Sequence, residues 1–193
     1  MWRIEYSELV SLRSPFARRI VASLLAPFAQ PAALLADTLS PGGQLLTGFS
    51  HPTLGYVGVG ICYDLRFPEL SLLHASRSCN VLAFPGAFNM TTGPAHWSLL
   101  LRARAVDCQC YVLACSPART KAPDVPGPHK HYEAYGHSMA VSPWGDVLGE
   151  AGSGEETVVV GIDVGRVKEV RAGVPTGGQK RRDLYRLEAV GEE

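Results

Sequence analysis

The sequence predicts an α/β fold with a mixed sheet, formed by a single domain. The chain has 193 residues, 46% of them hydrophobic and 19% charged, which is enough for one domain with a sizeable core. Short apolar runs rich in small and β-branched residues alternate with longer stretches of helical character. Two apolar runs joined by a turn add an antiparallel hairpin to strands that we expect to be parallel.

The first elements form a βαβ unit. The run YVGVGIC at 56–62 predicts a strand buried on both faces, and a short strand at 44–49 precedes it. Pro68 predicts the start of a helix that ends near Arg77, because the first helical turn does not need the N–H that proline lacks. The run NVLAFP at 80–85 predicts the next strand. Strand, helix and strand in this order require the two strands to be parallel.

The alternation then repeats. A proline opens a predicted helix over 94–109, in which Leu99, Ala103 and Val106 share one side. The run CYVLACS at 110–116 follows this helix at once and predicts a further buried strand.

The last third of the chain changes character. Prolines, histidines and lysines at 121–135 predict a loop. A hairpin is expected over 137–151, with PWGD as its turn, and another strand at 156–164. A short helix is expected at 165–173, followed by an extended basic tail from Val174.

The charge balance excludes several classes of partner. The chain has 18 basic and 18 acidic residues and a formal net charge of zero. We therefore expect neither nucleic-acid binding nor attraction to an anionic membrane. No apolar run reaches the about 18–20 residues that a membrane-spanning helix needs.

The chain contains five cysteines, namely Cys62, Cys79, Cys108, Cys110 and Cys115. Their number is odd, most lie in apolar segments, and none forms a CxxC pair. This usage predicts reduced thiols in a cytosol-like compartment and no structural zinc. We interpret all but Cys62 as buried core thiols.

Residues 1–36 differ from the remainder. This segment has four arginines and a small-residue apolar stretch that prolines interrupt. It is interpreted as a short extension or an N-terminus upstream of a domain fragment; the alternative is an organelle-targeting segment, against which Glu5 and Glu8 count. We therefore divide the chain into an extension at 1–36 and a domain at 37–193.

Cys62 is the candidate nucleophile. In GVGICYDLRFPEL it lies at the end of a predicted parallel strand, where reacting groups of α/β proteins collect. The Tyr63 N–H would donate to a developing oxyanion, and Arg66 could grip a substrate carboxylate. The alternative is an inert buried thiol, since free cysteines are among the most buried residues.

Four ordered blocks of sequence carry a resemblance. They are GICYDLRFPEL, the stretch from FPGAFN to SPAR, GHSMAVSPWGDVL and QKRRDLY, and the similarity runs from Asp37 to Tyr185. These blocks resemble the nitrilase superfamily of carbon–nitrogen hydrolases, in its omega-amidase branch.

The resemblance implies a partial αββα sandwich that dimerises, in the cytoplasm or the mitochondrion. It implies hydrolysis of a small amide, 2-oxoglutaramate or 2-oxosuccinamate, through a cysteine thioester, without a metal or organic cofactor. By position, Cys62 is the nucleophile, and Tyr63 is an oxyanion donor. Arg66 binds the substrate carboxylate, and Phe88 and Asn89 line the pocket.

The same resemblance implies a glutamate base and a lysine upstream of the nucleophile. All four lysines of this chain follow Cys62, and Glu5, Glu8 and Asp37 lie in no matching stretch. A lost general base costs about 10²–10⁴ in rate. A catalytically incomplete scaffold, acting as a homodimer or as partner of a full-length enzyme, is therefore the second hypothesis.

Local substitutes for the missing base are few. His96 and His137 could form a Cys–His pair, although a helix start and a strand start also explain them. Asp64 is expected to brace the turn after Cys62, and Glu69 to lie in the first turn of the helix, where its charge suits the helix dipole.

Overall fold

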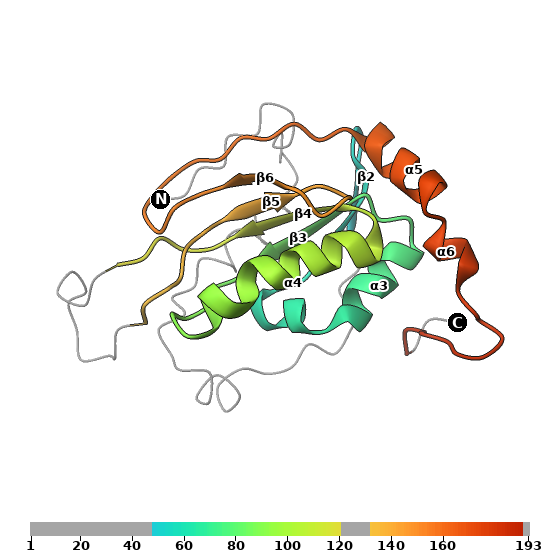
Figure 1. The fold of residues 1–193 in the computed structure, drawn as a ribbon, viewed down its shortest axis with the longest axis horizontal. Helices are drawn as coiled ribbons and strands as arrows, with labels where there is room; N and C mark the ends of the chain where they lie inside the picture. The colour runs from blue at the N-terminus through green and yellow to red at the C-terminus, as the bar shows by residue number, and fades with distance from the viewer. Residues whose placement is uncertain (1–47, 121–131, 191–193) are drawn as a thin grey trace.

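The computed structural model describes residues 48–120 and 132–190, which contain a six-stranded sheet (Figure 1). The strands are β1 (Phe49–His51), β2 (Gly55–Val59), β3 (Val81–Pro85), β4 (Tyr111–Cys115), β5 (Met139–Val141) and β6 (Val147–Glu150), and they lie in this order. The strands β2, β3 and β4 are parallel, whereas β1, β5 and β6 join antiparallel. The predicted α/β class, mixed sheet and parallel βαβ strands are confirmed.

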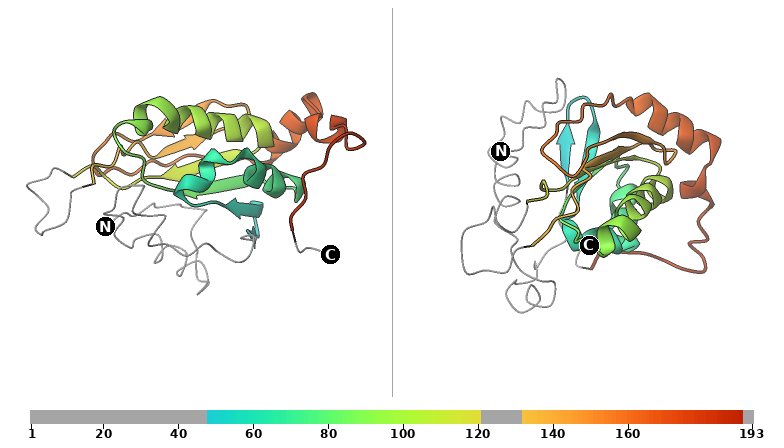
Figure 2. Two further views of the ribbon diagram at one scale, coloured as in Figure 1. Left: turned by 90° about the horizontal axis from the view of Figure 1, so that it is seen from below. Right: turned by 60° about the vertical axis from the view of Figure 1, so that its left-hand side comes forward.

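The described helices are the 3₁₀ helix η1 (Cys62–Arg66) and the α-helices α3 (Pro68–Ser76), α4 (Thr92–Cys108), α5 (Val164–Gly173) and α6 (Thr176–Gln179). Helices α3 and α4 lie side by side on one face of the sheet (Figure 1; Figure 2). Pro68 begins α3 as predicted, because its ring fixes the φ angle that a helix start needs.

Two element boundaries differ from the prediction. Strand β2 ends at Val59 rather than at Cys62, because Cys62 adopts φ 47° and opens η1 instead. Helix α4 begins at Thr92, ahead of its proline, because Asn89 Oδ1 accepts hydrogen bonds from the N–H groups of Thr91 and Thr92 at 3.1 and 2.8 Å.

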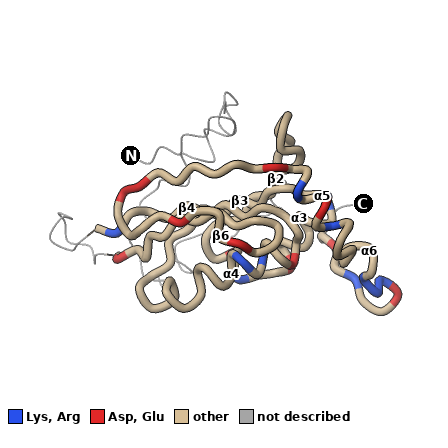
Figure 3. The backbone as a smooth tube through the Cα atoms, turned by 45° about the horizontal axis from the view of Figure 1, so that its top comes forward, with Lys and Arg blue, Asp and Glu red and all other residues tan. Residues whose placement is uncertain are grey.

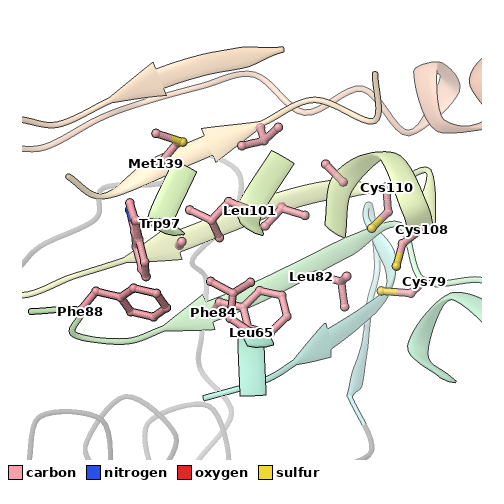
Figure 4. Close-up of a cluster of buried hydrophobic side chains, with 14 residues drawn as sticks. Leu65, Cys79, Leu82, Phe84, Phe88, Trp97, Leu101, Cys108, Cys110 and Met139 are labelled. Carbon is pink, nitrogen blue, oxygen red and sulfur yellow. The ribbon is translucent and has the colours of Figure 1, made fainter. Parts of the chain in front are cut away.

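The core occupies both faces of the parallel strands. Toward α3 and α4, Leu82 and Phe84 of β3 pack with Leu65, Trp97 and Leu101 (Figure 4). On the opposite face a second cluster joins α5 to the sheet through Leu54, Val57, Val81, Tyr111 and Val167. Burial on both faces explains the continuous apolar runs of β3 and β4.

The side of α4 that the apolar spacing aligns faces outward. Leu99 is 65% exposed and Val106 53% exposed. The helix instead buries the side that carries Trp97, Leu101 and Ala105, which recur every four residues. Arg104 is buried beside them because its guanidinium donates to the carbonyl of Leu65, and polar atoms with such partners can be buried at low cost.

The hairpin and the C-terminal helix are confirmed, but the strand predicted at 156–164 is wrong. This segment is extended and pairs with no strand in the described part of the chain. Val158 and Val160 lie against Gly149 of β6, whereas Val159 points outward. An alternating pattern describes extended backbone, which becomes a strand only when a neighbour supplies hydrogen bonds.

Some predictions lie outside the described residues, including the extension at 1–36, most of the strand at 44–49 and most of the loop at 121–135. Figure 3 shows Lys and Arg interspersed with Asp and Glu along the described backbone. In the tail, Arg181 pairs with Asp183. None of the described helices combines the length and apolarity required to cross a membrane.

Candidate active site

The chain makes a strained turn at Cys62 between β2 and α3. Cys62 has φ 47°, a left-handed conformation that costs a residue with a Cβ about 1–2 kcal/mol. The Asp64 carboxylate accepts a hydrogen bond from the Ile61 N–H at 2.8 Å, and so braces the turn as predicted. Strain of this kind persists where surrounding structure enforces it, and it gathers at functional sites.

A glycine makes room for this turn at the end of the neighbouring strand. A Cβ added to Gly86 would lie 2.7 Å from the Cα of Cys62. The Gly86 N–H in turn donates to the carbonyl of Cys115 on β4 at 2.9 Å. Cys62 is therefore held by backbone contact at the carboxyl edge of β2 and β3, the edge at which α/β proteins place reacting groups.

The surroundings of Cys62 raise the pKa of its thiol. Its Sγ donates to the carbonyl of Ala87 at 3.8 Å. Burial raises the pKa of Cys62 above its ordinary value of 9.0, and the Asp64 carboxylate raises it further. The guanidinium of Arg66 and the backbone N–H of Tyr63 act in the opposite direction. The described surroundings therefore hold the sulfur in position without activating it.

Tyr132 also belongs to this site, although no pattern in the sequence indicated it. Its hydroxyl donates to the same Ala87 carbonyl at 2.7 Å. Burial, together with the nearby Cys62 sulfur, raises the pKa of Tyr132 to about 12. Tyr132 lies in the stretch that was predicted as a loop, and no spacing connects it to the nucleophile.

Arg66 lies between aromatic rings beside the turn. Its Cζ is 4.7 Å from the ring centroid of Phe88 and 5.4 Å from that of Tyr63, and its Nη1 lies 3.2 Å from Nδ1 of His96. Cation–π contacts of this kind position a guanidinium while leaving N–H donors available. The structure thus brings Cys62, Tyr63, Arg66 and Phe88 together.

The side chains of Phe88 and Asn89 both have partners within the fold. Phe88 is buried and meets Trp97 edge to face, with ring centroids 5.0 Å apart. The Asn89 side chain caps the start of α4. Their assignment as pocket residues stays a prediction.

The two histidines pair with groups other than the thiol. His96 contacts Arg66, and His137 Nδ1 lies 2.8 Å from a carboxylate oxygen of Glu150. Glu69 lies in the first turn of α3, as expected. Within residues 48–120 and 132–190, no lysine or carboxylate forms a hydrogen bond or ion pair with Cys62.

Five charged residues considered in the sequence analysis, Glu5, Glu8, Asp37, Lys121 and Lys130, lie outside the described residues. In the part that the structure describes, no group of three or more His, Cys, Asp or Glu side chains is placed to hold a metal ion.

The fold and this turn define a class of α/β protein that presents a cysteine thiol where a parallel strand turns into a helix. The family model described as carbon–nitrogen hydrolase matches residues 18–172. The chain belongs to the carbon–nitrogen hydrolase family. The match begins within the stretch predicted as an extension, and the boundary between 1–36 and 37–193 stays a prediction.

Relatives and solved structures agree with this assignment. The chain is 49% identical over 154 residues to omega-amidase NIT2 of Bos taurus, covering 80% of this chain and 52% of that protein. It is 50% identical over 153 residues to omega-amidase NIT2 of Homo sapiens, covering 79% and 52%. The chain therefore spans about half the length of the curated relatives that it matches.

Among solved structures, Saccharomyces cerevisiae Nit3, a member of branch 10 of the nitrilase superfamily, aligns with a TM-score of 0.68 and 45% identity, covering 76% of this chain and 50% of that chain. The Caenorhabditis elegans NitFhit protein aligns with a TM-score of 0.71 and 38% identity, covering 80% and 36%. The predicted membership of the nitrilase superfamily is thereby confirmed.

Proposed function

We propose that this chain carries the nucleophile of an omega-amidase-type hydrolase, with Cys62 as the reacting residue. The observation that carries the proposal is the left-handed turn at Cys62, pressed against Gly86 at the carboxyl edge of the sheet. Backbone strain of this kind gathers at functional sites, and here it coincides with the carboxyl edge of parallel strands. The relatives named omega-amidase support an omega-amide as the substrate. The resemblance of the sequence implies the terminal amide of a dicarboxylic keto acid, 2-oxoglutaramate or 2-oxosuccinamate.

In the proposed reaction the Cys62 sulfur attacks the amide carbon, and the carbonyl oxygen becomes an oxyanion that the Tyr63 N–H stabilises. The C–N bond then breaks, the nitrogen takes the proton released by the thiol, and ammonia leaves. Water attacks the thioester, which yields the dicarboxylate and restores the thiol. Arg66 would hold the substrate carboxylate with paired N–H donors, and Phe88 and Asn89 would line the pocket.

One observation favours a second candidate. The pKa of Cys62 is raised, and the described residues bring no base or lysine to it. A chain with that electrostatic environment would serve as a scaffold that binds a second copy of itself or a full-length enzyme. For either function we place the protein in the cytoplasm, with the mitochondrion as the alternative.

The deciding experiment measures ammonia release from 2-oxoglutaramate and succinamate by the purified chain. The matched variants are Cys62→Ala and Cys115→Ala, because Cys115 is also half-buried with a raised pKa but lies on β4. Turnover that Cys62→Ala abolishes and Cys115→Ala retains supports hydrolysis. Ammonia release no greater than that of Cys62→Ala refutes it.

The second candidate has its own readout. Size-exclusion chromatography with light scattering gives the mass of the chain alone and after mixing with full-length human omega-amidase. A stable homodimer or mixed complex supports the scaffold. A chain that stays monomeric and does not bind the full-length enzyme contradicts it.

A further inference from the structure

Three cysteine side chains gather at the end of the sheet opposite the Cys62 turn. Cys79 precedes β3, Cys110 precedes β4, and Cys108 ends α4, and Figure 4 shows their sulfur atoms grouped together at one end of the core. We propose that Cys79 and Cys110 are a peroxide-sensitive pair that closes into an intramolecular disulfide, at a site independent of the hydrolytic function proposed for Cys62.

The backbone places this pair at disulfide range. Strands β3 and β4 are parallel, with Val81 opposite Tyr111, and the Tyr111 N–H donates to the carbonyl of Asn80 at 3.0 Å. This register sets Cys110 opposite Asn80, one residue beyond Cys79. Neighbouring strands lie about 4.7–4.9 Å apart and successive residues about 3.3 Å apart along a strand, so the Cα atoms of Cys79 and Cys110 lie about 6 Å apart, within the about 4.4–6.8 Å of a disulfide. Both side chains belong to one buried cluster (Figure 4).

The surrounding hydrogen bonds give the two thiols different roles. The Cys79 Sγ accepts a hydrogen bond from the Gly58 N–H at 3.3 Å and donates to the carbonyl of Val81 at 2.9 Å. The Gly58 N–H points at the Cys79 sulfur and would stabilise a thiolate there. We therefore assign Cys79 as the attacking thiol and Cys110 as the resolving one.

Cys79 and Cys110 are fully buried, and residues of α5 and α6 cover their end of the sheet. The Arg171 side chain donates to the carbonyl of Cys79. The Gln109 side chain donates to the carbonyl of Val174 and accepts from the Thr176 hydroxyl. These bonds come from α5 and α6, and Val174 is 42% exposed. Hydrogen peroxide is little larger than water, so local opening of this cover admits it.

The chemistry balances with one peroxide. The Cys79 thiolate attacks a peroxide oxygen, which gives a sulfenic acid and hydroxide. The Cys110 sulfur then attacks the sulfenic sulfur, the S–O bond breaks, and the S–S bond forms. Two thiols lose two hydrogens and two electrons, and one peroxide becomes two waters.

The test is peptide mapping of the full-length chain after treatment with hydrogen peroxide, in chelator-containing buffer and without reduction. The expected product is one cross-linked peptide pair that contains Cys79 and Cys110, with the loss of two hydrogens and of two titratable thiols, reversed by dithiothreitol. Because this measurement uses the wild-type chain, it does not depend on whether a variant folds. Unchanged Cys79 and Cys110, or a bond that joins another pair, would overturn the proposal.

Two matched variants separate the roles. Cys110→Ala removes the resolving thiol, so Cys79 should accumulate as a sulfenic acid that dimedone traps. Cys108→Ala removes a neighbouring buried thiol of the same cluster and should leave the cross-link intact. Loss of the cross-link in Cys108→Ala, with retention in Cys110→Ala, would show that Cys108 is the partner and refute the assignment. Urea unfolding checks that both variants are folded.

Discussion

Replacing Cys62 with glycine and with alanine measures the strain of the turn directly. Both substitutions remove the thiol, so their difference reports on the backbone alone. The matched pair is Cys115→Gly and Cys115→Ala, since Cys115 ends the regular strand β4 and has no positive φ. We expect the order of stability of the glycine and alanine variants to be opposite at the two positions.

Two opposing effects set the expected difference in the free energy of unfolding between the glycine and alanine variants. Alanine at φ 47° keeps the left-handed penalty of about 1–2 kcal/mol, which glycine avoids. Glycine loses more chain entropy on folding, at a cost of about 0.5–1 kcal/mol. Cys62→Gly should therefore be more stable than Cys62→Ala by about 0.5–1 kcal/mol, whereas Cys115→Gly should be less stable than Cys115→Ala by about the same amount.

Urea unfolding followed by circular dichroism gives the free energy of unfolding of each variant. With a slope of about 2 kcal/mol per molar urea, the expected midpoint shifts are a few tenths of a molar and are opposite in sign. If Cys62→Gly is less stable than Cys62→Ala by as much as the glycine variant is at Cys115, the turn is unstrained, and the principal support for a nucleophile there is lost.

Three further predictions concern the surroundings of the site. Gly86→Ala places a Cβ 2.7 Å from the backbone of Cys62 and should lower the free energy of unfolding by about 1–3 kcal/mol. Gly161→Ala, whose added Cβ has no atom within 4 Å, should leave it unchanged in the same urea unfolding experiment. Equal effects of the two substitutions would contradict the close approach. The folded pKa of Tyr132 is raised from 10.0 to about 12, so the contribution of its protonated hydroxyl to stability is complete below pH 10.0 and is lost as the pH rises toward 12. The free energy of unfolding of the wild type should therefore approach that of Tyr132→Phe between pH 10.0 and 12. A difference that stays constant over this range would count against the buried hydroxyl. Arg104→Ala removes two buried charge-assisted hydrogen bonds and should lower the free energy of unfolding by at least about 2 kcal/mol. Arg102→Ala should cost clearly less, because that guanidinium lies near the surface and makes one such bond. The reverse order in urea unfolding would refute this account.

The elements of this fold could be predicted because their signals are local. Pro68 marks a helix start, and the apolar runs of β2, β3 and β4 mark strands, wherever they lie in the chain. In α4 the buried Trp97, Leu101 and Ala105 follow the helical period, but the burial of Arg104 could not be predicted, because it depends on hydrogen bonds to a distant carbonyl. Partners so far away in sequence leave no periodic trace.

The candidate site likewise contains residues that could be predicted from the sequence and residues that could not. Cys62, Tyr63 and Arg66 are close in sequence, and one turn sets their placement. Tyr132 reaches the site only through a carbonyl 45 residues away. The grouping of Cys79 with Cys110 likewise depends on strand register, so five scattered cysteines were interpreted as one nucleophile and four core thiols.

The backbone geometry at Cys62 favours a nucleophile, whereas its electrostatic surroundings favour the protonated thiol over the reactive thiolate. The turn, Gly86 beside it and the Tyr63 N–H all lie among the described residues, so these residues alone set the position of the sulfur. Its ionisation does need more, because burial and Asp64 both favour the thiol. Local structure can strain a backbone, but it offsets burial of a thiolate only when a cation or proton acceptor approaches. Among residues 48–120 and 132–190, the Arg66 guanidinium lowers the pKa of Cys62 but does not outweigh burial. Hydrolysis by this chain therefore requires a further group that takes the thiol proton, and the ammonia assay decides between enzyme and scaffold.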